Sequence, residues 1–191
     1  VRYADDFLLG FVGPKNEAET IRQQLAEFLM DRLRLTPSPE KTHITNAATE
    51  KARFLGYDVG IYRGDRYQSK IQRGATKART RATNGKIRLE MPRQAVQEIR
   101  RRFSRGNKVI DRAERLHDHD YSIIQSYQSV LRGLHNYYCL ATNVGDRMSE
   151  VKWMLQTSLT KTLAHKYRRT VNSIYRKYQV VNCEGRKVLQ V

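Results

Sequence analysis

The sequence predicts an α+β fold, with β-hairpins and one helix in the first third of the chain and only helices in its second half. Two observations predict it. Short β-prone segments flank turn-forming residues at the N-terminus and again around residue 60, whereas from residue 92 apolar residues recur at intervals of three and four. We therefore expect an α+β unit at 1–62, a basic linker at 63–91, a helical domain at 92–178, and a tail or the start of a further domain at 179–191.

The composition favours a polyanionic partner. The 191 residues include 36 Lys+Arg against 19 Asp+Glu, which gives a net charge of +17, and nucleic acid is the first expectation for such a charge. An anionic membrane is the alternative, but the cations are spread along the chain, and the apolar run at 7–12 is too short for a span or a signal sequence. Cys139 and Cys183 lack metal-site spacing, and we expect Cys139 to be a buried thiol.

Two adjacent carboxylates, Asp5 and Asp6, lie between apolar segments at the N-terminus. The pattern is typical of a tight hairpin with both acids at or beside its turn. On a straight strand they would point to opposite faces, whereas a turn can bring both near one metal ion. Mg²⁺ usually takes one or two carboxylates plus phosphates and water, and a pair of such ions can clamp a phosphoryl transfer. The alternative is an ordinary surface turn, where Asp is common.

An amphipathic helix should follow the hairpin. Asn16 is a plausible N-cap with Glu19 three residues on, as in a capping box, and Pro37 prevents continuation at the other end. We expect the apolar face to pack on the sheet of the hairpin. This face consists of Ile21, Leu25, Phe28, Leu29 and Leu33.

A second hairpin is expected at 52–62, which is rich in β-formers and interrupted by glycines. We place its turn near Gly60 or Gly64 and Gly56 within a strand, where a glycine allows close approach of another backbone. The following linker carries many Lys and Arg residues and little apolar periodicity. Such a tract is often merely solvated, but phosphate contact is the favoured interpretation.

The helical domain should begin at Pro92, with a first helix that Gly106 ends. The segment His117-Asp118-His119-Asp120 suggests a metal site, but no further ligand cluster is evident, and Asp120 suits the N-cap of the next helix. Three apolar stripes define the helices: Ala95, Val96, Ile99 and Phe103; then Ile123, Ile124, Tyr127, Val130, Leu131, Leu134 and Tyr138; then Met148, Val151, Leu155, Leu159 and Leu163.

Five motifs carry a resemblance to known proteins. Tyr3-Ala4-Asp5-Asp6 with the apolar residues that follow resembles the active-site motif of reverse transcriptases, and residues 35–42 and 54–57 continue that resemblance in order. Residues 132–138 and 162–166 look like the maturase (X) domain of group II intron-encoded proteins. The resemblance covers nearly the whole chain. It implies the C-terminal half of a reverse transcriptase palm followed by a thumb/maturase helical bundle.

The resemblance also implies a function, which is RNA-directed DNA synthesis joined to assistance of group II intron splicing. It implies Mg²⁺ as the cofactor, with Asp5 as the first choice of ligand and Asp6 as the second. Lys41 would approach the incoming nucleotide, where a cation can stabilise or protonate the leaving pyrophosphate; a solvated loop lysine is the alternative. The residues that flank the site or hold the primer would be Tyr3, Ala4, Leu55, Gly56 and Tyr57.

The end of the last long helical pattern is strongly basic. Cations suit a helix C-terminus, but their number exceeds what capping needs, so we expect a surface that faces RNA. The candidate RNA contacts, including two on the preceding helix, are Arg132, Asn136, Lys161, Lys166, Arg168 and Arg169.

The chain starts inside a predicted strand, and reverse transcriptases carry fingers, the first half of the palm and another metal-binding Asp before this point. We therefore expect a fragment that does not polymerise alone. Its expected partners are intron RNA, an RNA template with a DNA primer, dNTP and the missing N-terminal half, with no membrane, in a bacterial cytoplasm or an organelle. The alternative is an RNA-binding maturase module without catalysis. The maturase-like motifs argue against a third possibility, a reverse transcriptase of another retroelement or a defence system.

Overall fold

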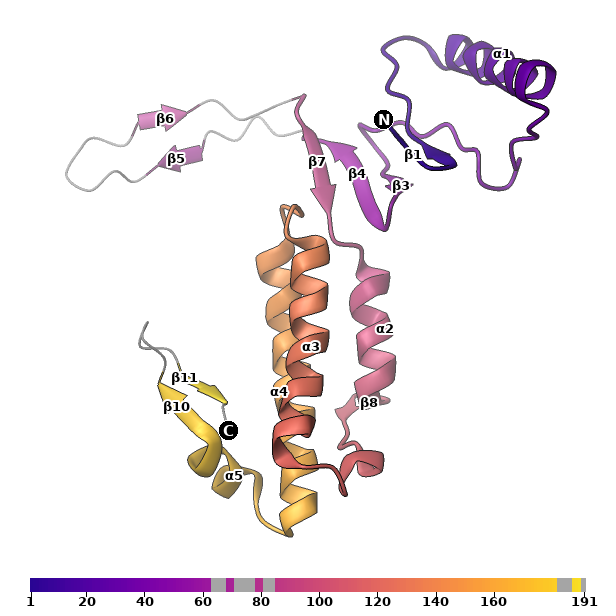
Figure 1. The fold of residues 1–191 in the computed structure, drawn as a ribbon. Helices are drawn as coiled ribbons and strands as arrows, with labels where there is room; N and C mark the ends of the chain where they lie inside the picture. The colour runs from indigo at the N-terminus through magenta and orange to yellow at the C-terminus, as the bar shows by residue number, and fades with distance from the viewer. Residues whose placement is uncertain (63–67, 71–77, 81–84, 182–186, 190–191) are drawn as a thin grey trace. The chain divides into compact units, whose positions relative to one another are not determined.

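The computed structural model describes residues 1–62, 68–70, 78–80, 85–181 and 187–189. It divides into two compact units, Val1–Arg88 and Leu89–Val191. The first contains one helix and several short antiparallel strands, and the second is built mainly of helices (Figure 1). The predicted mixture of helix and sheet is confirmed. The prediction that the second half contains only helices is wrong, because two short antiparallel strand pairs, at 104–109 and 179–189, accompany its helices.

A minimal hairpin opens the first unit. Strands β1 (Arg2–Tyr3) and β2 (Asp6–Phe7) are antiparallel, with Arg2 opposite Phe7 and Tyr3 opposite Asp6. This register leaves Ala4 and Asp5 as a two-residue turn. Ala4 has a φ of 51°, a left-handed conformation that costs a residue with a side chain about 1–2 kcal/mol. The predicted hairpin is therefore present, with Asp5 in its turn and Asp6 at the start of the returning strand.

Helix α1 (Lys15–Leu33) follows the hairpin, and its start differs from the prediction. The N-cap is Pro14, whose extended backbone precedes the first helical residue, and no side chain caps the helix. Asn16 lies inside the first turn, where its carbonyl accepts a hydrogen bond from the hydroxyl of Thr20. The capping-box prediction is wrong, because Pro14, two residues before Asn16, is already the N-cap of the helix. The helix ends at Arg34, in the left-handed conformation, before Pro37 as predicted.

The apolar face of α1 is only partly covered by the described residues, since Ile21, Leu25 and Leu29 are half-buried. No α1 residue is buried, and Phe28 and Leu33 are each 54% exposed. The expected packing of this face on the hairpin sheet is therefore wrong. A hairpin with two-residue strands offers too little surface to cover a helix of 19 residues.

A three-stranded sheet with the order β3-β4-β7 completes the first unit; its strands are β3 (Ala52–Phe54), β4 (Tyr57–Ile61) and β7 (Ile87–Glu90). The β3–β4 turn consists of Leu55 and Gly56, with φ values of 46° and 73°. This pair of positive φ angles suits a tight hairpin turn. The predicted turn at Gly60 is therefore wrong, since Gly60 lies buried within β4, and Gly56 is in the turn rather than a strand. The alternative turn at Gly64 lies outside the described residues.

The stretch expected to be a linker contains regular structure. Strands β5 (Gln68–Lys70) and β6 (Ala78–Thr80) pair antiparallel, and β7 joins the three-stranded sheet. The backbone N–H of Tyr62 donates to the carbonyl of Lys86, and the Tyr62 carbonyl accepts from the N–H of Gly85. These bonds join the two ends of the segment that contains β5 and β6. Gly64 and most of the predicted basic tract lie outside the described residues.

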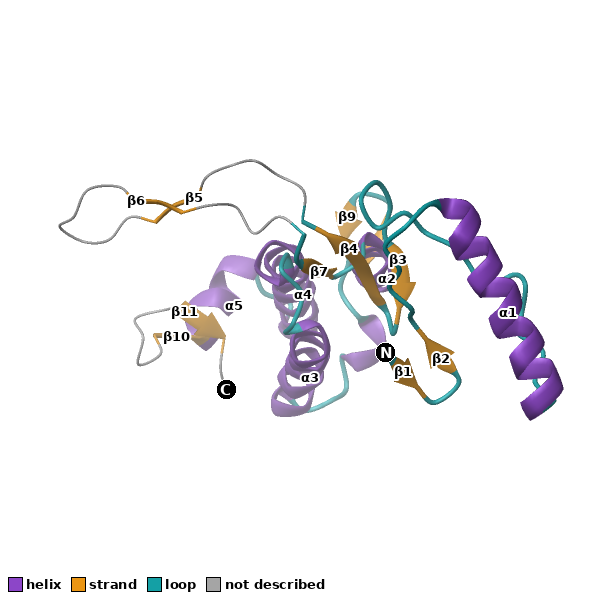
Figure 2. Ribbon diagram, turned by 90° about the horizontal axis from the view of Figure 1, so that it is seen from above, coloured by secondary structure: helices purple, strands orange, loops and turns teal. Residues whose placement is uncertain are grey.

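The second unit is organised around one long helix, α4, which packs against α2, α3 and α5 (Figure 2). A tight turn at Gly106 joins β8 to β9, so Gly106 is not the helix C-cap that its position suggested. The elements are α2 (Arg93–Phe103), β8 (Ser104–Arg105), β9 (Lys108–Val109), η1 (Ala113–Arg115), α3 (Asp120–Tyr138), α4 (Val144–Tyr167), α5 (Val171–Tyr178), β10 (Gln179–Val181) and β11 (Lys187–Leu189).

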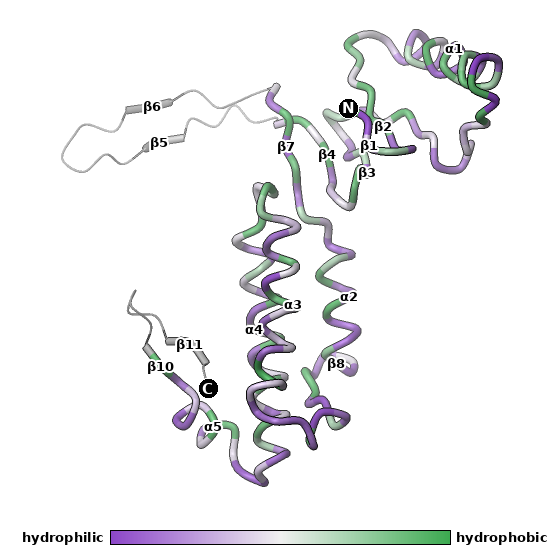
Figure 3. Tube along the Cα trace, in the orientation of Figure 1, coloured by the Kyte–Doolittle hydropathy of each residue, from purple (hydrophilic) through white to green (hydrophobic). Residues whose placement is uncertain are grey.

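The core of this unit follows the predicted stripes, and Figure 3 colours the same helices by hydropathy. All the stripe residues named for α2 and α4 are buried, as are Ile123, Ile124, Tyr127 and Tyr138 of α3. Cys139, in contrast, is exposed at the end of α3, so the prediction of a buried thiol is wrong. It is the C-cap of α3 and lies between the buried residues Tyr138 and Ala141, with its own side chain on the exposed side.

Buried hydroxyl groups link α3 to α4. The Tyr127 hydroxyl lies 3.0 Å from Ser158 Oγ and 3.1 Å from Thr162 Oγ1. Ser158 donates to the carbonyl of Ile110, and the backbone N–H of Arg112 donates to Thr162. Burial raises the pKa of Tyr127 despite these bonds. The network ties the segment before η1 to both long helices. Every buried side-chain polar atom of the described residues has a hydrogen-bond partner.

The loop between α3 and α4 is held by an asparagine that mimics a strand. Asn143 Oδ1 accepts from the backbone N–H of Met91 at 2.8 Å, and its Nδ2 donates to the Met91 carbonyl at 3.1 Å. Next to it, both the N–H and the hydroxyl of Thr142 donate to the carbonyl of Leu89. Met91 is 1% exposed, so water does not readily replace these bonds.

Replacing Asn143 by Ala should lower the free energy of unfolding by about 1–3 kcal/mol, because both backbone groups of a buried residue lose their partners. Urea unfolding of the full chain, followed by circular dichroism, measures the change. The matched control is Asn136→Ala on the exposed surface of α3, which should change stability by no more than about 0.5 kcal/mol. Equal effects of the two substitutions would contradict the assigned role of Asn143.

Candidate functional site

The two acidic residues of the N-terminal hairpin are both exposed. Neither carboxylate has a hydrogen bond or an ion pair with another described residue. The turn places them on successive positions around a sharp bend, which suits two ligands that share one ion better than a straight strand does. Carboxylates with free coordination sites beside water fit Mg²⁺, which keeps several waters and takes few protein ligands. Within the described residues, no cluster of three or more His, Cys, Asp or Glu side chains that could hold a metal is present.

Backbone strain marks the same motif and the predicted primer-holding motif. Among the described residues, non-glycine residues with positive φ are Ala4, Arg34, Leu55 and Arg168. Arg34 and Arg168 are helix C-caps, where this conformation is usual. Ala4 and Leu55 are instead at hairpin turns, each inside a motif singled out from the sequence. Such strained positions gather at functional sites.

The remaining predicted residues of the first unit lie on its surface or at its hairpin. Tyr3 is 66% exposed and pairs with Asp6 across β1 and β2. Tyr57 follows the Leu55–Gly56 turn and lies opposite Phe54. Lys41 is exposed, and its backbone N–H donates to the carbonyl of Ser38 in a turn before β3.

Two of the six candidate RNA contacts are engaged within the protein. The ammonium group of Lys161 donates to the carbonyl of Val109 at 2.6 Å, and that of Lys166 donates to the Asp118 carbonyl and, at 2.8 Å, to the carboxylate of Asp120. The Lys166 side chain is only 20% exposed. The geometry thus gives each of these two lysines a structural role inside the helical unit.

Asp120 is the centre of a polar cluster that joins three helices. Its carboxylate accepts hydrogen bonds from Lys166 and Tyr167 at the end of α4 and from Tyr178 at the end of α5. Asp120 is the first residue of α3, and the N-cap is His119. The predicted N-cap role of Asp120 is therefore wrong, since its carboxylate is taken by side chains far along the chain.

The cluster shifts the pKa of each of its acidic groups. Burial raises the pKa of Asp120, but the hydrogen bonds from Lys166, Tyr167 and Tyr178 outweigh it and lower the pKa to about 2. The bond to Asp120 raises the pKa of Tyr167 to about 12, and burial together with Asp120 raises the pKa of Tyr178. A negative charge is thereby fixed among three donors.

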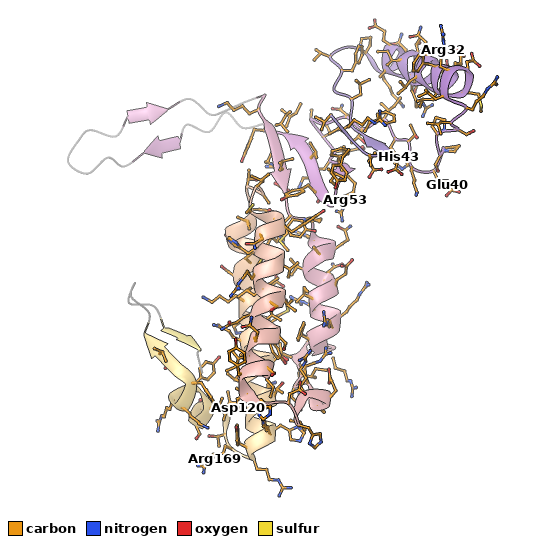
Figure 4. The ribbon with its side chains drawn as sticks, in the orientation of Figure 1. Arg32, Glu40, His43, Arg53, Asp120 and Arg169 are labelled. Atoms are coloured by element: carbon orange, nitrogen blue, oxygen red, sulfur yellow. The ribbon has the colours of Figure 1, made fainter. Side chains whose placement is uncertain are left out.

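Arg168 and Arg169 remain available at the same end of the bundle. Both are exposed, and neither side chain has an ion pair or a hydrogen bond with another described residue. Figure 4 shows Asp120 and Arg169 at this end of the helices. Arg176 and Lys177 of α5 are exposed as well, and the Lys177 ammonium lies 4.7 Å from the Tyr167 ring centre. We call Arg168, Arg169, Arg176 and Lys177 the basic end.

Arg132 and Asn136 lie one turn apart on the exposed side of α3. Arg132 lines a groove between α3 and α4 whose lining also includes His135 and the cation Lys152. Neither His135 nor Lys152 was singled out from the sequence. His135 is three residues after Arg132 on α3, whereas Lys152 is on α4. The sequence would have indicated that they share a surface with Arg132 only if the packing of α3 on α4 had been known.

The helical unit, with its buried stripes and its basic end, is also the part of the chain that a known protein family matches. Residues 96–189 match the model of the type II intron maturase family, and these residues belong to that family. The match extends over α5 and the β10–β11 hairpin, which includes most of the segment expected to be a tail.

The chain is 33% identical over 183 residues to the group II intron-encoded protein LtrA of Lactococcus lactis subsp. cremoris, which covers 90% of this chain and 29% of that protein. It is 36% identical over 188 residues to the putative COX1/OXI3 intron 1 protein of Saccharomyces cerevisiae, covering 93% of this chain and 22% of the relative. It is 26% identical over 214 residues to the uncharacterized mitochondrial protein ymf11 of Marchantia polymorpha, covering 88% and 29%. The chain thus spans less than a third of these relatives and resembles bacterial and mitochondrial proteins.

None of the described helices combines the length and the hydrophobicity that a bilayer crossing requires.

Proposed function

We propose that the helical unit binds group II intron RNA and assists its splicing. The observation that carries this proposal is the basic end, where four exposed cations stand beside a cluster that has already neutralised Asp120 with Lys166. The cations are therefore free to meet phosphates. The net charge of +17 and the family match support the same partner. The relatives from a bacterium and from mitochondria support a bacterial cytoplasm or an organelle as the location.

We further propose that the first unit is the second half of a reverse transcriptase palm. Asp5 and Asp6 would hold Mg²⁺, which when bound supplies charge stabilisation to the attacking and leaving oxygens of nucleotide addition. Lys41 would stabilise the pyrophosphate of dNTP, and the Leu55–Gly56 turn with Tyr57 would hold the primer on an RNA template. Polymerisation needs a further carboxylate and the fingers, so a segment that supplies them must join this unit.

An RNA-binding maturase module without catalysis is the second candidate. It is favoured by the contrast between the two units. The helical unit has a continuous buried core, whereas α1 of the first unit has no buried residue, and Asp5 and Asp6 have no third carboxylate near them among the described residues. Under this alternative the first unit contributes no chemistry even when the remaining polymerase segments are present.

Salt dependence of RNA binding tests the primary proposal. Replacing Arg168 and Arg169 together by Gln should flatten the dependence of log K on log salt by up to about 1.4, since each phosphate contact to single-stranded RNA contributes about 0.7. Folding should be unchanged, because both side chains are exposed. Gln at the C-cap position of Arg168 meets the same left-handed backbone conformation as the Arg that it replaces. The measurement is a salt titration of binding to a group II intron RNA.

The matched comparison is the pair Lys161→Gln and Lys166→Gln, which removes the same charge from side chains with partners inside the protein. That pair should lower stability, measured by urea unfolding. If the Arg168/Arg169 variant kept both the affinity and the salt slope of the unmodified chain, the basic end would not meet RNA.

A further inference from the structure

A groove of about 430 Å³ lies between the second half of α3 and the first half of α4. It is within the size range of small-molecule sites. Residues of both helices form it, and both helices belong to the helical unit. Its lining consists of Gln128, Leu131, Arg132, His135, Gly145, Met148, Ser149 and Lys152.

The lining combines an apolar floor with cations and no acid. Leu131 is half-buried and Met148 is buried, so they form the floor, while Arg132 on α3 and Lys152 on α4 are exposed cations on its two sides. The nearest acids along α4 do not line the groove, and one of them, Glu150, is paired with Arg100. Neither Arg132 nor Lys152 has an ion pair with another described residue.

We propose that this groove holds one unpaired nucleotide of RNA. A base fits the apolar floor of Leu131 and Met148, and its phosphate lies between Arg132 and Lys152. Its edge meets the amide of Gln128 and the hydroxyl oxygen of Ser149, which donates to the Gly145 carbonyl at 2.8 Å and keeps acceptor capacity. Protein readout of RNA concentrates on such unstacked, splayed-out nucleotides. The inference rests on the proposed RNA binding of the helical unit and adds a site and a structural preference to it.

Charge selects this occupant over a second copy of the chain. Both walls of the groove are cationic, and the chain carries a net charge of +17, so self-association through the groove would bring like charges together. A nucleotide supplies an anion and an apolar ring within one small unit, which matches both features of the lining.

Two glycines provide a test that leaves folding intact. Gly145 lines the groove and Gly133 does not, and a Cβ added at either meets nothing within 4 Å. Both are exposed and helical, so Leu is compatible with the backbone at each and favours the helix. Gly145→Leu should fill the groove, and Gly133→Leu is the matched control.

The probes are a hairpin RNA with a single bulged adenosine and the same hairpin fully paired, each titrated with the full chain. The unmodified chain and Gly133→Leu should bind the bulged hairpin about tenfold more tightly than the paired one, a difference equal to about 1.4 kcal/mol. Gly145→Leu should bind both hairpins equally, at the affinity of the paired one. Lys152→Gln should reduce the preference without changing the fold.

A bulge preference that persists in Gly145→Leu would overturn the proposal, as would the absence of any preference in the unmodified chain. A further test compares polyglutamate with single-stranded RNA as competitors for the bulged hairpin, at the same concentration of charge. Equal competition by the two would also overturn the proposal, in favour of an acidic protein partner. In all these outcomes the chain still binds RNA, so they are distinct from a failure to bind either hairpin at low salt, which would contradict the proposed function itself.

Discussion

Replacing Asp120 by Asn is expected to destabilise the helical unit clearly, because the change breaks a charged cluster that joins three helices. The carboxylate accepts from Lys166, Tyr167 and Tyr178, and its side chain is 17% exposed. Asn keeps the shape but removes the charge, which leaves the partly buried ammonium of Lys166 without its counter-ion. Lowering the pKa of Asp120 from 3.8 to about 2 corresponds to about 2 kcal/mol of stability at neutral pH.

The pH dependence has a defined direction. Since the pKa of Asp120 is lower in the folded chain, its contribution is fully present above the unfolded value of 3.8 and is lost as the pH falls through the folded value of about 2. The difference in unfolding free energy between the unmodified chain and Asp120→Asn should therefore be constant near pH 7 and shrink between pH 3.8 and about 2.

Urea unfolding by circular dichroism at several pH values measures this difference. Asp118→Asn is the matched control, since that carboxylate is 42% exposed and its ion pair with Arg115 is 3.5 Å long. The control should lose no more than about 1 kcal/mol. A loss for Asp120→Asn that equals the control, or one that persists undiminished at pH 2, would exclude the charged cluster as a stabilising element.

The helical core was predictable because periodicity reports burial. Val151, Leu155 and Leu159 recur along one face of α4, and all are buried. The same argument misled for α1, where the described residues cover the stripe that contains Phe28 only in part and bury none of it. An apolar stripe indicates which face of a helix packs against a partner. It does not indicate whether that partner belongs to the same part of the chain.

Caps and turns were less predictable because several residues could serve each role. Asn16 has the right type for an N-cap, but Pro14 lies closer to the start of α1. In the second hairpin several glycines offered turns, and only the register, with Phe54 opposite Tyr57, selects the Leu55–Gly56 pair. Local residue type limits these choices, and tertiary pairing decides among them.

The roles of the basic residues depended on partners far away in sequence. Lys166 and Asp120 are 46 residues apart, and Lys161 meets the carbonyl of Val109 from 52 residues away. In the sequence these lysines are indistinguishable from Arg168 and Arg169, which remain exposed. The groove cations Arg132 and Lys152 are likewise brought together only by the packing of α3 on α4. The sequence therefore predicts a basic surface, and the fold selects which cations belong to it.

The second large effect is expected at the acidic hairpin. The 191-residue chain alone should show no Mg²⁺-dependent primer extension on an RNA template, because Asp5 and Asp6 do not complete a two-metal site. Fusion to a segment that supplies fingers and the first half of the palm should restore extension. In that fusion Asp5→Asn should lower the extension rate at least about 100-fold, since it removes charge that holds the ion against the reacting phosphate.

Asp6→Asn in the same fusion should have a smaller effect, because Asp5, in the turn itself, is the first choice of ligand and Asp6 begins the returning strand. Asp31→Asn, on the exposed surface of α1, is the control for loss of an acid and should leave the rate unchanged. Steady-state extension at several Mg²⁺ concentrations separates weaker metal binding from slower chemistry. Near-normal turnover of the Asp5→Asn fusion at every Mg²⁺ concentration would remove Asp5 from the metal site, and inactivity of the unsubstituted fusion with intact RNA binding would favour the maturase module without catalysis.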